Sequence, residues 1–329
     1  ILEMNTIEHL DPEFNISDYP NLMSFDGYHN MGLKQIDPTG CPNLMRLTVD
    51  VTDIESVDVS KNPYLTILNV SNTKVTSLDI SKNPYLLELY CDHYGSYNYE
   101  YKISELDLSN NPKLKYLFCA GNNLTNLDIS KCPELITVAA NNNYLTSFDV
   151  SKNPNLYIVE IHNNCLDFAT LPLDPGTWNT YYYGQRPFPA EKSYKVGSTF
   201  DYSSRVLREG TITDAALYSI SEESGSASPV DPSYYTYENG VMTINQIPQD
   251  SVYIAFANSM FPDAILTTGK FKLKSDDEYG DSIKAFSFTS GAANGAELAL
   301  GIGILGATPE NPKEFYVCFG DYTSQTFTT

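Results

Sequence analysis

The chain has 329 residues, of which 42% are hydrophobic and 19% are charged, so two or three folded domains are expected. The 41 acidic residues outnumber the 20 lysines and arginines, and the formal net charge is -21. A field of that sign repels nucleic acid and anionic membranes, so neither is expected as a partner. No apolar run approaches the roughly 20 residues that a membrane helix needs, so no membrane span is expected.

Proline recurs through the first half of the chain at nearly constant spacing. Pro42, Pro63, Pro84, Pro112, Pro133 and Pro154 follow one another at intervals of 21, 21, 28, 21 and 21 residues. Most of them end a segment similar to LDISKNP, and a segment of the form LxxLxLxxNxL follows. The clearest copies are LKYLFCAGNNL from Leu114 and LITVAANNNYL from Leu135. This period indicates stacked repeats.

Position 1 of each repeat is a leucine, namely Leu22, Leu44, Leu65, Leu86, Leu114, Leu135 and Leu156. Apolar residues at positions 4 and 6 predict a short strand with one buried face, which a repeat can cover only by stacking on its neighbours. Asparagine at position 9, as in Asn122 and Asn143, is expected to bond the backbone of adjacent turns. The LDIS return segment is too short for an α-helix, so we expect an extended stretch and then a tight or 3₁₀ turn. The fold class is therefore mainly β, a weakly curved solenoid of about seven repeats without true α-helices on the return side.

The repeat unit, written LxxLxC/VxxNxLTxLDISKNP, resembles the short leucine-rich repeats of Bacteroidetes surface and secreted proteins, which are similar in style to internalins. The resemblance covers roughly residues 1–172. It implies a binding or adhesion protein that works outside the cytoplasm, at the cell surface or secreted, and it is compatible with a lipid anchor on a removed N-terminal segment. The segment before Leu22 and the IDPTGCP before Pro42 depart from the pattern, which predicts a cap or the start of a trimmed array.

After Leu166 the repeat pattern stops, and we predict three domains. These are the solenoid with an irregular start (residues 1–185), an Ig-like β-sandwich (186–274), and an acidic linker with a partial β-module (275–329). Short alternating runs support the sandwich, and Asn239-Gly240 between two of them predicts a hairpin. The last piece is expected to pack on the sandwich, or the natural chain to continue beyond Thr329.

Side chains at positions 3, 5 and 7 of the repeats are expected to face solvent. Tyr90 and Phe118 both occupy position 5, so their rings should lie about 5 Å apart on neighbouring strands. The predicted aromatic shelf comprises Tyr90, Tyr116, Phe118 and Tyr157, edged by Glu88, Asp92 and Glu160. Sugars stack on such a surface and bond to its carboxylates, and peptides with basic groups can do the same. The alternative is that these aromatic residues are there as good strand formers.

A seven-residue insertion accounts for the longer, 28-residue interval. It lies within the segment DHYGSYNYEYK, between Cys91 and Ile103. The tyrosines Tyr94, Tyr97 and Tyr99 lie on a loop with glycine and serine, and ordering them costs entropy unless they pack or bind something. We predict that the loop forms one wall of the aromatic shelf, with local packing on the solenoid as the alternative.

No catalytic, cofactor or metal site is predicted. GIGILG at residues 301–306 matches GxGxxG but has only strand-like sequence after it, the histidines lie on repeats too far apart to share a metal, and the cysteines lack CxxC spacing. Cys91 and Cys119 share position 6 and are expected to be buried thiols. The aspartates of the LDIS segments are Asp58, Asp79, Asp107, Asp128 and Asp149. They are expected to cap the turns at the serines that follow, with calcium binding as the alternative.

The sequence therefore predicts a non-catalytic binding protein, a monomer whose protein or peptide ligand lies on the outer face of the solenoid. Its placement outside the cytoplasm is implied by the resemblance alone. The alternative is a glycan-capture component of a surface nutrient-uptake system, carried by the same aromatic shelf. No cofactor is expected.

Overall fold

The structure is a computed structural model that describes residues 2–4, 15–94, 100–173, 175–181, 184–191, 193–208, 211, 213–221, 224–248, 251–275, 314–318 and 324–328. The chain divides into two compact units, residues 1–274 and 275–329.

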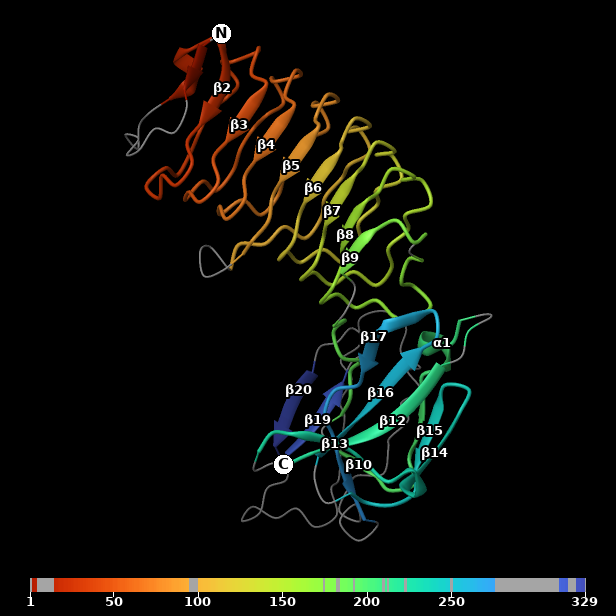
Figure 1. Ribbon diagram of the computed structural model, residues 1–329. Coiled ribbons are helices and arrows are strands. Elements are labelled where there is room, and N and C mark those ends of the chain that lie inside the picture. The colour runs from red at the N-terminus through yellow and green to blue at the C-terminus, as the bar shows by residue number, and fades with distance from the viewer. Residues whose placement is uncertain are drawn as a thin grey trace, which may run out of the picture. The chain divides into compact units, whose positions relative to one another are not determined.

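One parallel sheet runs through the first half of the chain, with its strands side by side in chain order (Figure 1). The strands are β1 (Leu2–Met4), β2 (Leu22–Asp26), β3 (Arg46–Thr48), β4 (Ile67–Asn69), β5 (Glu88–Tyr90), β6 (Tyr116–Phe118), β7 (Thr137–Ala139), β8 (Ile158–Glu160) and β9 (Asn179–Tyr181). From β3 onward the first residues of successive strands are 21, 21, 28, 21, 21 and 21 residues apart, so each repeat contributes one strand.

The position-4 residues of these strands form a single interior row. Leu68 on β4 pairs with Leu89 on β5, which pairs with Leu117 on β6, and all three side chains are fully buried. This confirms the prediction that each repeat covers its apolar edge by stacking on its neighbours. Cys91 and Cys119 lie in the same core as free thiols.

The return side of the repeats is extended and then turns tightly. Leu78 and Ile80 point into the core, and no α-helix occurs in the part of the solenoid that the structure describes. The backbone N–H of Asn83 donates to the carbonyl of Ile80 at 3.1 Å, and the N–H of Leu86 donates to the carbonyl of Asn83 at 3.2 Å. The SKNP segment is therefore two consecutive tight turns, as predicted.

Asparagine at position 9 joins neighbouring repeats through their backbones. The Asn122 Nδ2 donates to the carbonyls of Cys91 at 2.8 Å and Cys119 at 3.1 Å, and its Oδ1 accepts from the N–H of Ile103 at 2.9 Å. Asn143 and Asn164 repeat this pattern in the following repeats. These bonds satisfy buried backbone groups that the three-residue strands do not reach.

A second ladder runs along the turns, where the sequence had assigned the asparagine of SKNP no role. Asn83 is fully buried, and its Nδ2 donates to the carbonyls of Val59 at 3.0 Å and Asn62 at 2.9 Å in the preceding repeat. Cys132 takes the same place one repeat after Asn111, and its Sγ lies 3.4 Å from the Asn111 carbonyl. The ladder consists of Cys41, Asn62, Asn83, Asn111, Cys132 and Asn153.

The repeat geometry continues one turn further than the sequence pattern indicated. Strand β9 pairs with β8 in parallel, with Asn179 opposite Ile158. Gln185 is buried 21 residues after Asn164, and its Nε2 donates to the carbonyl of Ile161 at 3.0 Å. The expectation that the register fails after Leu166 was wrong, because a longer amide can substitute for asparagine in the ladder.

Residues 188–274 form small sheets around a second set of buried side chains. One sheet has the order β11 (Thr199–Asp201), β15 (Val241–Ile244), β14 (Tyr235–Glu238), and another has the order β13 (Ala227–Pro229), β12 (Thr213–Ile220), β16 (Ser251–Asn258), β17 (Phe261–Thr267). Strands β10 (Ser193–Lys195) and β18 (Lys272–Lys274) form a parallel pair. Met242 of the first sheet and Ile254 and Phe256 of the second are fully buried.

The predicted hairpin is confirmed by the backbone. Asn239 and Gly240 join β14 and β15 with φ angles of 49° and 83°, which is the left-handed conformation that a tight hairpin turn needs. The only helices in the described residues are η1 (Ile16–Asp18), α1 (Ser203–Val206) and η2 (Pro232–Tyr234). None of them has the length and apolar composition required to cross a bilayer.

In the second unit the described secondary structure is one antiparallel pair of strands, β19 (Glu314–Cys318) and β20 (Ser324–Thr328). Most of the predicted acidic linker and the whole GIGILG segment lie outside the described residues.

Candidate functional site

The outer face of the sheet at β5 and β6 carries the predicted aromatic shelf. In both strands the middle residue is buried, while the first and third residues are half-buried and face outward. The strand register places Tyr116 beside Glu88 and Phe118 beside Tyr90. Tyr90, Tyr116, Phe118 and Glu88 are therefore together on one face, as the spacing predicted.

The rings of Tyr90 and Phe118 are stacked. Their centroids are 4.8 Å apart and the ring planes differ by 5°. The Tyr90 hydroxyl donates a hydrogen bond of 2.9 Å to the Glu88 carboxylate two residues earlier on the same strand. Burial, and next the hydrogen bond to Glu88, raise the pKa of Tyr90 to about 12. The phenol therefore keeps its proton, and the ring is fixed by the stack and by its hydroxyl.

The sequence had suggested that Asp92 lies on an exposed edge of the shelf. In the structure Asp92 is buried, with only 7% of its surface exposed. Its Oδ1 accepts from the N–H of Ala120 at 3.1 Å, and its Oδ2 accepts from the Ser71 hydroxyl at 3.4 Å. Burial, opposed in part by these hydrogen bonds, raises the pKa of Asp92 to about 6, and the charge of Glu160 adds to the shift. Asp92 is thus a buried carboxylate at the side of the shelf.

Tyr94 comes from the insertion and borders the same region. Its backbone N–H donates to the Asn72 Oδ1 at 2.8 Å, and its side chain is 47% exposed. Burial of the phenol and the charge of Asp92 raise the pKa of Tyr94 to about 12, against a hydrogen bond from Asn141, and Glu160 adds to the increase. Tyr97 and Tyr99 lie outside the described residues.

Glu160 reaches the shelf from β8, three strands beyond β5. In the strand register, Phe118 pairs with Ala139 on β7, and Ala139 pairs with Glu160. Glu160 acts on both Asp92 and Tyr94. Ala139, which lies between Phe118 and Glu160 in the strand register, is 3% exposed.

Tyr157 is not part of the shelf. It precedes β8, and its backbone N–H donates to the carbonyl of Ile136 at 2.8 Å. Two strand spacings of about 4.8 Å separate its repeat from β6, and Tyr157 is at the other end of its strand from the position of Phe118. The side chain is 55% exposed on that edge of the sheet.

Three buried polar atoms near the shelf have no hydrogen-bond partner among the described residues. They are the Oδ1 of Asn141, whose side chain is 4% exposed, the Nδ1 of His162 on the next repeat, and the Nδ1 of His93. The other ring nitrogen of His93, Nε2, lies 3.1 Å from the Thr73 carbonyl, and burial lowers the pKa of this histidine.

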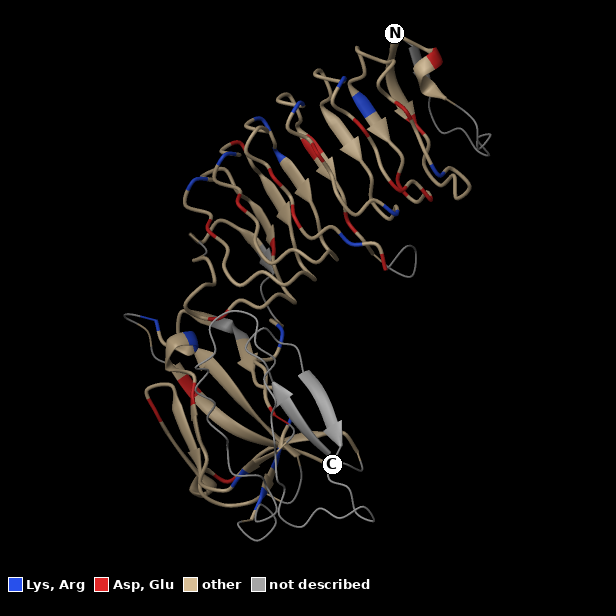
Figure 2. Cartoon of the chain, turned by 180° about the vertical axis from the view of Figure 1, so that it is seen from behind, with Lys and Arg blue, Asp and Glu red and all other residues tan. Residues whose placement is uncertain are grey.

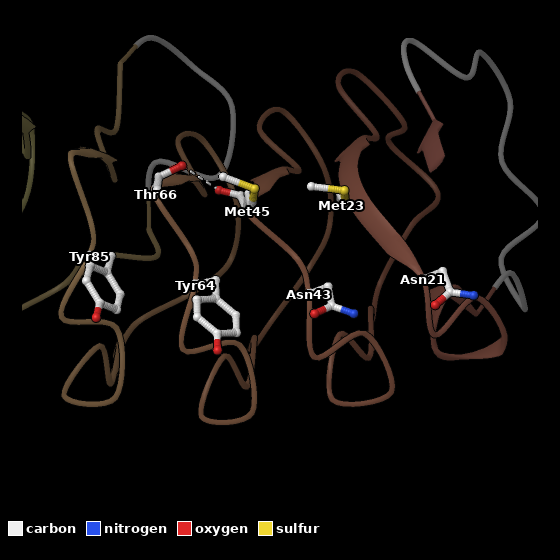
Figure 3. Close-up of a pocket in the computed structure, with 7 residues that line it drawn as sticks. All are labelled: Asn21, Met23, Asn43, Met45, Tyr64, Thr66 and Tyr85. Carbon is white, nitrogen blue, oxygen red and sulfur yellow. Dashed lines mark hydrogen bonds between the residues drawn. The ribbon is translucent and has the colours of Figure 1, made fainter. Parts of the chain in front are cut away.

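A groove that the sequence did not reveal lies along the edge where the strands begin (Figure 3). Its volume is about 750 Å³, and it is lined by Asn21, Met23, Asn43, Met45, Tyr64, Thr66 and Tyr85. Figure 3 shows Tyr85, Tyr64, Asn43 and Asn21 in one row and the two methionines in another. The rings of Tyr64 and Tyr85 are stacked, with centroids 6.4 Å apart, and each side chain is 55% exposed. The available signal was the tyrosine that follows KNP in these two successive repeats.

Charged residues of both signs lie along the solenoid (Figure 2). The predicted turn caps are present: the Ser81 N–H, for example, donates to the Asp79 Oδ1 at 2.9 Å, and this bond lowers the pKa of Asp79. The other LDIS aspartates bond the serines that follow them in the same way. Within the described residues, no three His, Cys, Asp or Glu side chains are arranged to hold a metal ion.

No protein-family model matches the chain, and no curated protein does either. Among solved structures, the functional domain of InlJ from Listeria monocytogenes, described as including a cysteine ladder, is 18% identical, with a TM-score of 0.42 over 83% of this chain and 81% of that one. The TLR13–ssRNA13 complex is 15% identical, with a TM-score of 0.37 over 59% of this chain and 32% of that one. The leucine-rich repeat domain of APL1B is 17% identical, with a TM-score of 0.38 over 58% of this chain and 63% of that one.

Likenesses at this level say nothing about a ligand or an activity, and the chain spans less than two thirds of the TLR13 and APL1B chains. The fold assignment rests on the chain itself. One strand per 21-residue repeat, leucines at positions 1 and 4, and a buried asparagine ladder at position 9 make the first half of this protein a leucine-rich-repeat solenoid.

Proposed function

We propose that this chain is a non-catalytic binding protein that holds a protein or peptide ligand on the outer face of the solenoid, at the aromatic shelf of Tyr90, Tyr116 and Phe118. The observation that carries the proposal is the stacked, outward-facing pair of Tyr90 and Phe118. Aromatic side chains contribute more than most others to binding free energy when a partner covers them.

The shelf is prepared for binding because its backbone and its rings are already fixed. Strands β5 and β6 belong to one continuous sheet, and buried asparagines tie the flanking turns together. The Tyr90 hydroxyl is held by Glu88. Ordering flexible side chains is a major cost of association, so a surface that is already ordered binds more tightly for the same contact area.

The charge of the chain favours a basic or neutral ligand. The formal net charge is -21, and Glu88 and Glu160 are on or beside the shelf. Attraction over distance accelerates encounter with a basic partner, and this contribution weakens as salt screens it.

The test is selection of a displayed random peptide library on the whole chain, followed by affinity measurement on Tyr90→Ala/Phe118→Ala. The matched control is Tyr64→Ala/Tyr85→Ala, which removes another stacked, outward-facing pair, three residues before the first residues of β4 and β5. We expect selected peptides to bind at least tenfold more weakly to the first variant and equally well to the control. Equal binding to both variants and the unmodified chain would exclude the shelf as the ligand site.

A second candidate is glycan capture, and the groove beside Tyr64 and Tyr85 favours it. The lining has no charged residue in a strongly acidic chain, and it combines stacked rings with the amides of Asn21 and Asn43. Sugar rings pack their C–H faces on aromatic rings while amides bond their hydroxyls. Here the roles of the variants reverse: a glycan array should lose its signal with Tyr64→Ala/Tyr85→Ala and keep it with Tyr90→Ala/Phe118→Ala.

The remaining proposals concern organisation and location. We propose a solenoid over residues 1–185, an Ig-like module over 186–274 that acts as a spacer or second contact surface, and a further β-module over 275–329. We also propose that the protein is a monomer and that it acts outside the cytoplasm, on the cell surface or secreted; the resemblance of its repeats supports that location. Light scattering of the purified chain and fractionation of the source cells test these two points.

A further inference from the structure

The groove at the edge where the strands begin crosses four successive repeats. Tyr64 and Tyr85 lie three residues before the first residues of β4 and β5, and Asn21 and Asn43 take the equivalent position in the two preceding repeats. The four side chains therefore form one row that runs along the solenoid, across the strands (Figure 3). Three strand spacings of about 4.8 Å separate the first member of the row from the last, so the row is about 14 Å long.

The groove is open along this row. Its volume is about 750 Å³, and none of the residues that line it is buried. Tyr64 and Tyr85 are each 55% exposed, and Met45 in the second row of Figure 3 is 40% exposed. The ring centroids of the two tyrosines are 6.4 Å apart, which exceeds the carbon–carbon contact distance of about 3.5–4.0 Å. The rings therefore do not cover each other face to face, and each keeps apolar surface for a ligand.

The polar groups of the row are available to a ligand. Within the part of the chain that the structure describes, the side-chain amides of Asn21 and Asn43 make no hydrogen bond, and neither do the hydroxyls of Tyr64 and Tyr85. An amide offers both donors and an acceptor, and a phenol offers one donor and accepts as well. The row thus combines two exposed rings with four polar groups that can bond a partner.

The same position in the later repeats differs, because its side chains bond within the protein. The Lys113 Nζ lies 2.7 Å from the Glu134 carboxylate, and the Asn155 Nδ2 donates to the carbonyl of Pro133 at 3.3 Å. The row is therefore satisfied internally beyond Tyr85 and left unsatisfied over the groove. This contrast marks the groove as the part of the row that is suited to a ligand.

The composition of the lining indicates an uncharged ligand. The chain carries a formal net charge of -21, yet no charged residue lines the groove, and the next member of the row, Lys113, is paired with Glu134. An anionic ligand would find no free cation in the groove and would be repelled by the rest of the chain, while a cationic ligand would bind better to the acidic surface elsewhere. Amides and phenols suit a ligand rich in hydroxyls, and the exposed rings suit its C–H surfaces.

The spacing of the row distinguishes an extended peptide from a glycan. Side chains on one side of an extended peptide recur about every 6.7 Å, so they lose register with a row whose members recur about every 4.8 Å. A β-1,4-linked pyranose chain advances by nearly one strand spacing per sugar, because its two glycosidic bonds leave opposite sides of each ring. Such a chain can therefore place one sugar unit at each repeat.

We propose that the groove binds an unbranched, uncharged β-1,4-linked glucan, which lies along the solenoid with one sugar unit at each of the four repeats. Tyr64 and Tyr85 pack on the sugars at one end, and the amides of Asn21 and Asn43 bond the hydroxyls of the sugars at the other end. The equatorial hydroxyls of glucose leave C–H groups on both faces of the ring, so successive units stack although each is turned over relative to its neighbour. The inference rests on the second candidate function, glycan capture, and adds the linkage, charge and direction of the ligand.

The test is an NMR titration of the whole chain with cellobiose, cellotetraose and cellohexaose, which contain two, four and six β-1,4-linked glucose units. Maltotetraose, with four α-1,4-linked glucose units, is the ligand control. The variants are Tyr64→Ala/Tyr85→Ala and Asn43→Ala. The matched control is Tyr157→Ala, which removes an equally exposed tyrosine just before β8, on a later repeat. Circular dichroism verifies that each variant is folded.

We expect cellotetraose to bind the unmodified chain and Tyr157→Ala equally, to bind Tyr64→Ala/Tyr85→Ala at least tenfold more weakly, and to bind Asn43→Ala several-fold more weakly. The affinity should rise at least tenfold from cellobiose to cellotetraose and change little with cellohexaose, since the groove crosses four repeats. The proposal is overturned if cellotetraose does not bind, if maltotetraose binds as tightly, or if cellobiose and cellotetraose bind with equal affinity.

The glycan array separates failure of this inference from failure of glycan capture. If the glycans that lose binding in Tyr64→Ala/Tyr85→Ala are branched, charged or α-linked, the groove remains a glycan site and the β-1,4-glucan assignment is overturned. An array without any signal would overturn both. Peptide binding at the aromatic shelf is tested independently, because Tyr90→Ala/Phe118→Ala leaves every residue of the groove unchanged.

Discussion

Tyr90 and Phe118 occupy paired positions on neighbouring strands, and their ring centroids are 4.8 Å apart. That separation matches the spacing of about 4.8 Å between strands in a sheet. Two aromatic residues at the same position of successive repeats therefore stack without any adjustment of the backbone. Tyr64 and Tyr85 also share one position of successive repeats and are stacked, with their ring centroids 6.4 Å apart. The solenoid thus converts a period in the sequence into ordered rows of side chains.

The buried Asp92 gives the stability of the protein a measurable pH dependence. Its folded-state pKa of about 6 is above the ordinary value of 3.8, so the folded state holds the proton more tightly than the unfolded state does. The contribution of this group to stability therefore decreases as pH rises from about 4 to about 6. Asp92→Asn removes this loss and should stabilise the chain above pH 6 by on the order of 2 kcal/mol, with little difference near pH 4.

Urea unfolding at a series of pH values measures this effect. Asp149→Asn is a control of opposite sign, because the bond from the Ser151 N–H lowers the pKa of Asp149. Asp149 stabilises the folded state at pH values above its ordinary, unfolded-state pKa. This stabilisation is lost as the pH falls through the lower pKa that Asp149 has in the folded state. An Asp92→Asn variant that is less stable than the unmodified chain at pH 7 would mean that the carboxylate is stabilised where it lies.

The turn ladder predicts an ordered series of substitutions at Asn83. Asn83→Ala leaves the buried carbonyls of Val59 and Asn62 without a donor and should cost about 3 kcal/mol of unfolding free energy. Asn83→Cys should cost about half as much, because Cys132 fills the same position and its thiol points to the equivalent carbonyls. Denaturant unfolding of the two variants measures the difference, and equal losses would show that the thiol does not replace the amide.

The aspartates of the LDIS segments should act as turn caps that need no metal. Each accepts a backbone hydrogen bond from the serine two residues later, as Asp107 does from Ser109 at 2.9 Å. Excess EGTA should therefore leave the melting temperature unchanged, while Asp107→Ala should lower it slightly. A fall in melting temperature with EGTA that added calcium reverses would instead support the calcium alternative.

The parts of the fold that depend on the repeat period could be predicted from the sequence. The interior row of Leu68, Leu89 and Leu117 and the stacking of Tyr90 on Phe118 follow from equal positions on adjacent strands. The Asn239-Gly240 hairpin follows from residues that tolerate positive φ. In each case the preference of the local sequence and the packing of the surrounding structure favour the same arrangement.

The features that the sequence did not reveal depend on which groups the end of a side chain contacts, and not on its position in the repeat. Asn83 was assigned to a turn, although its amide reaches back to the preceding repeat; the cysteines at the equivalent positions of IDPTGCP and LDISKCP hinted at a buried site. Asp92 was expected in solvent but is 7% exposed and accepts hydrogen bonds from Ser71 and Ala120 of the neighbouring repeats.

The most direct test of the account is the affinity of a library-selected peptide for three proteins: the unmodified chain, Tyr90→Ala/Phe118→Ala and Tyr64→Ala/Tyr85→Ala. We predict that the dissociation constant rises at least tenfold only when the Tyr90–Phe118 stack is removed, because truncated aromatic anchors typically cost more than about 1 kcal/mol each. Unchanged affinity in that variant, with its fold intact by circular dichroism, would contradict the assignment of the aromatic shelf as the binding surface.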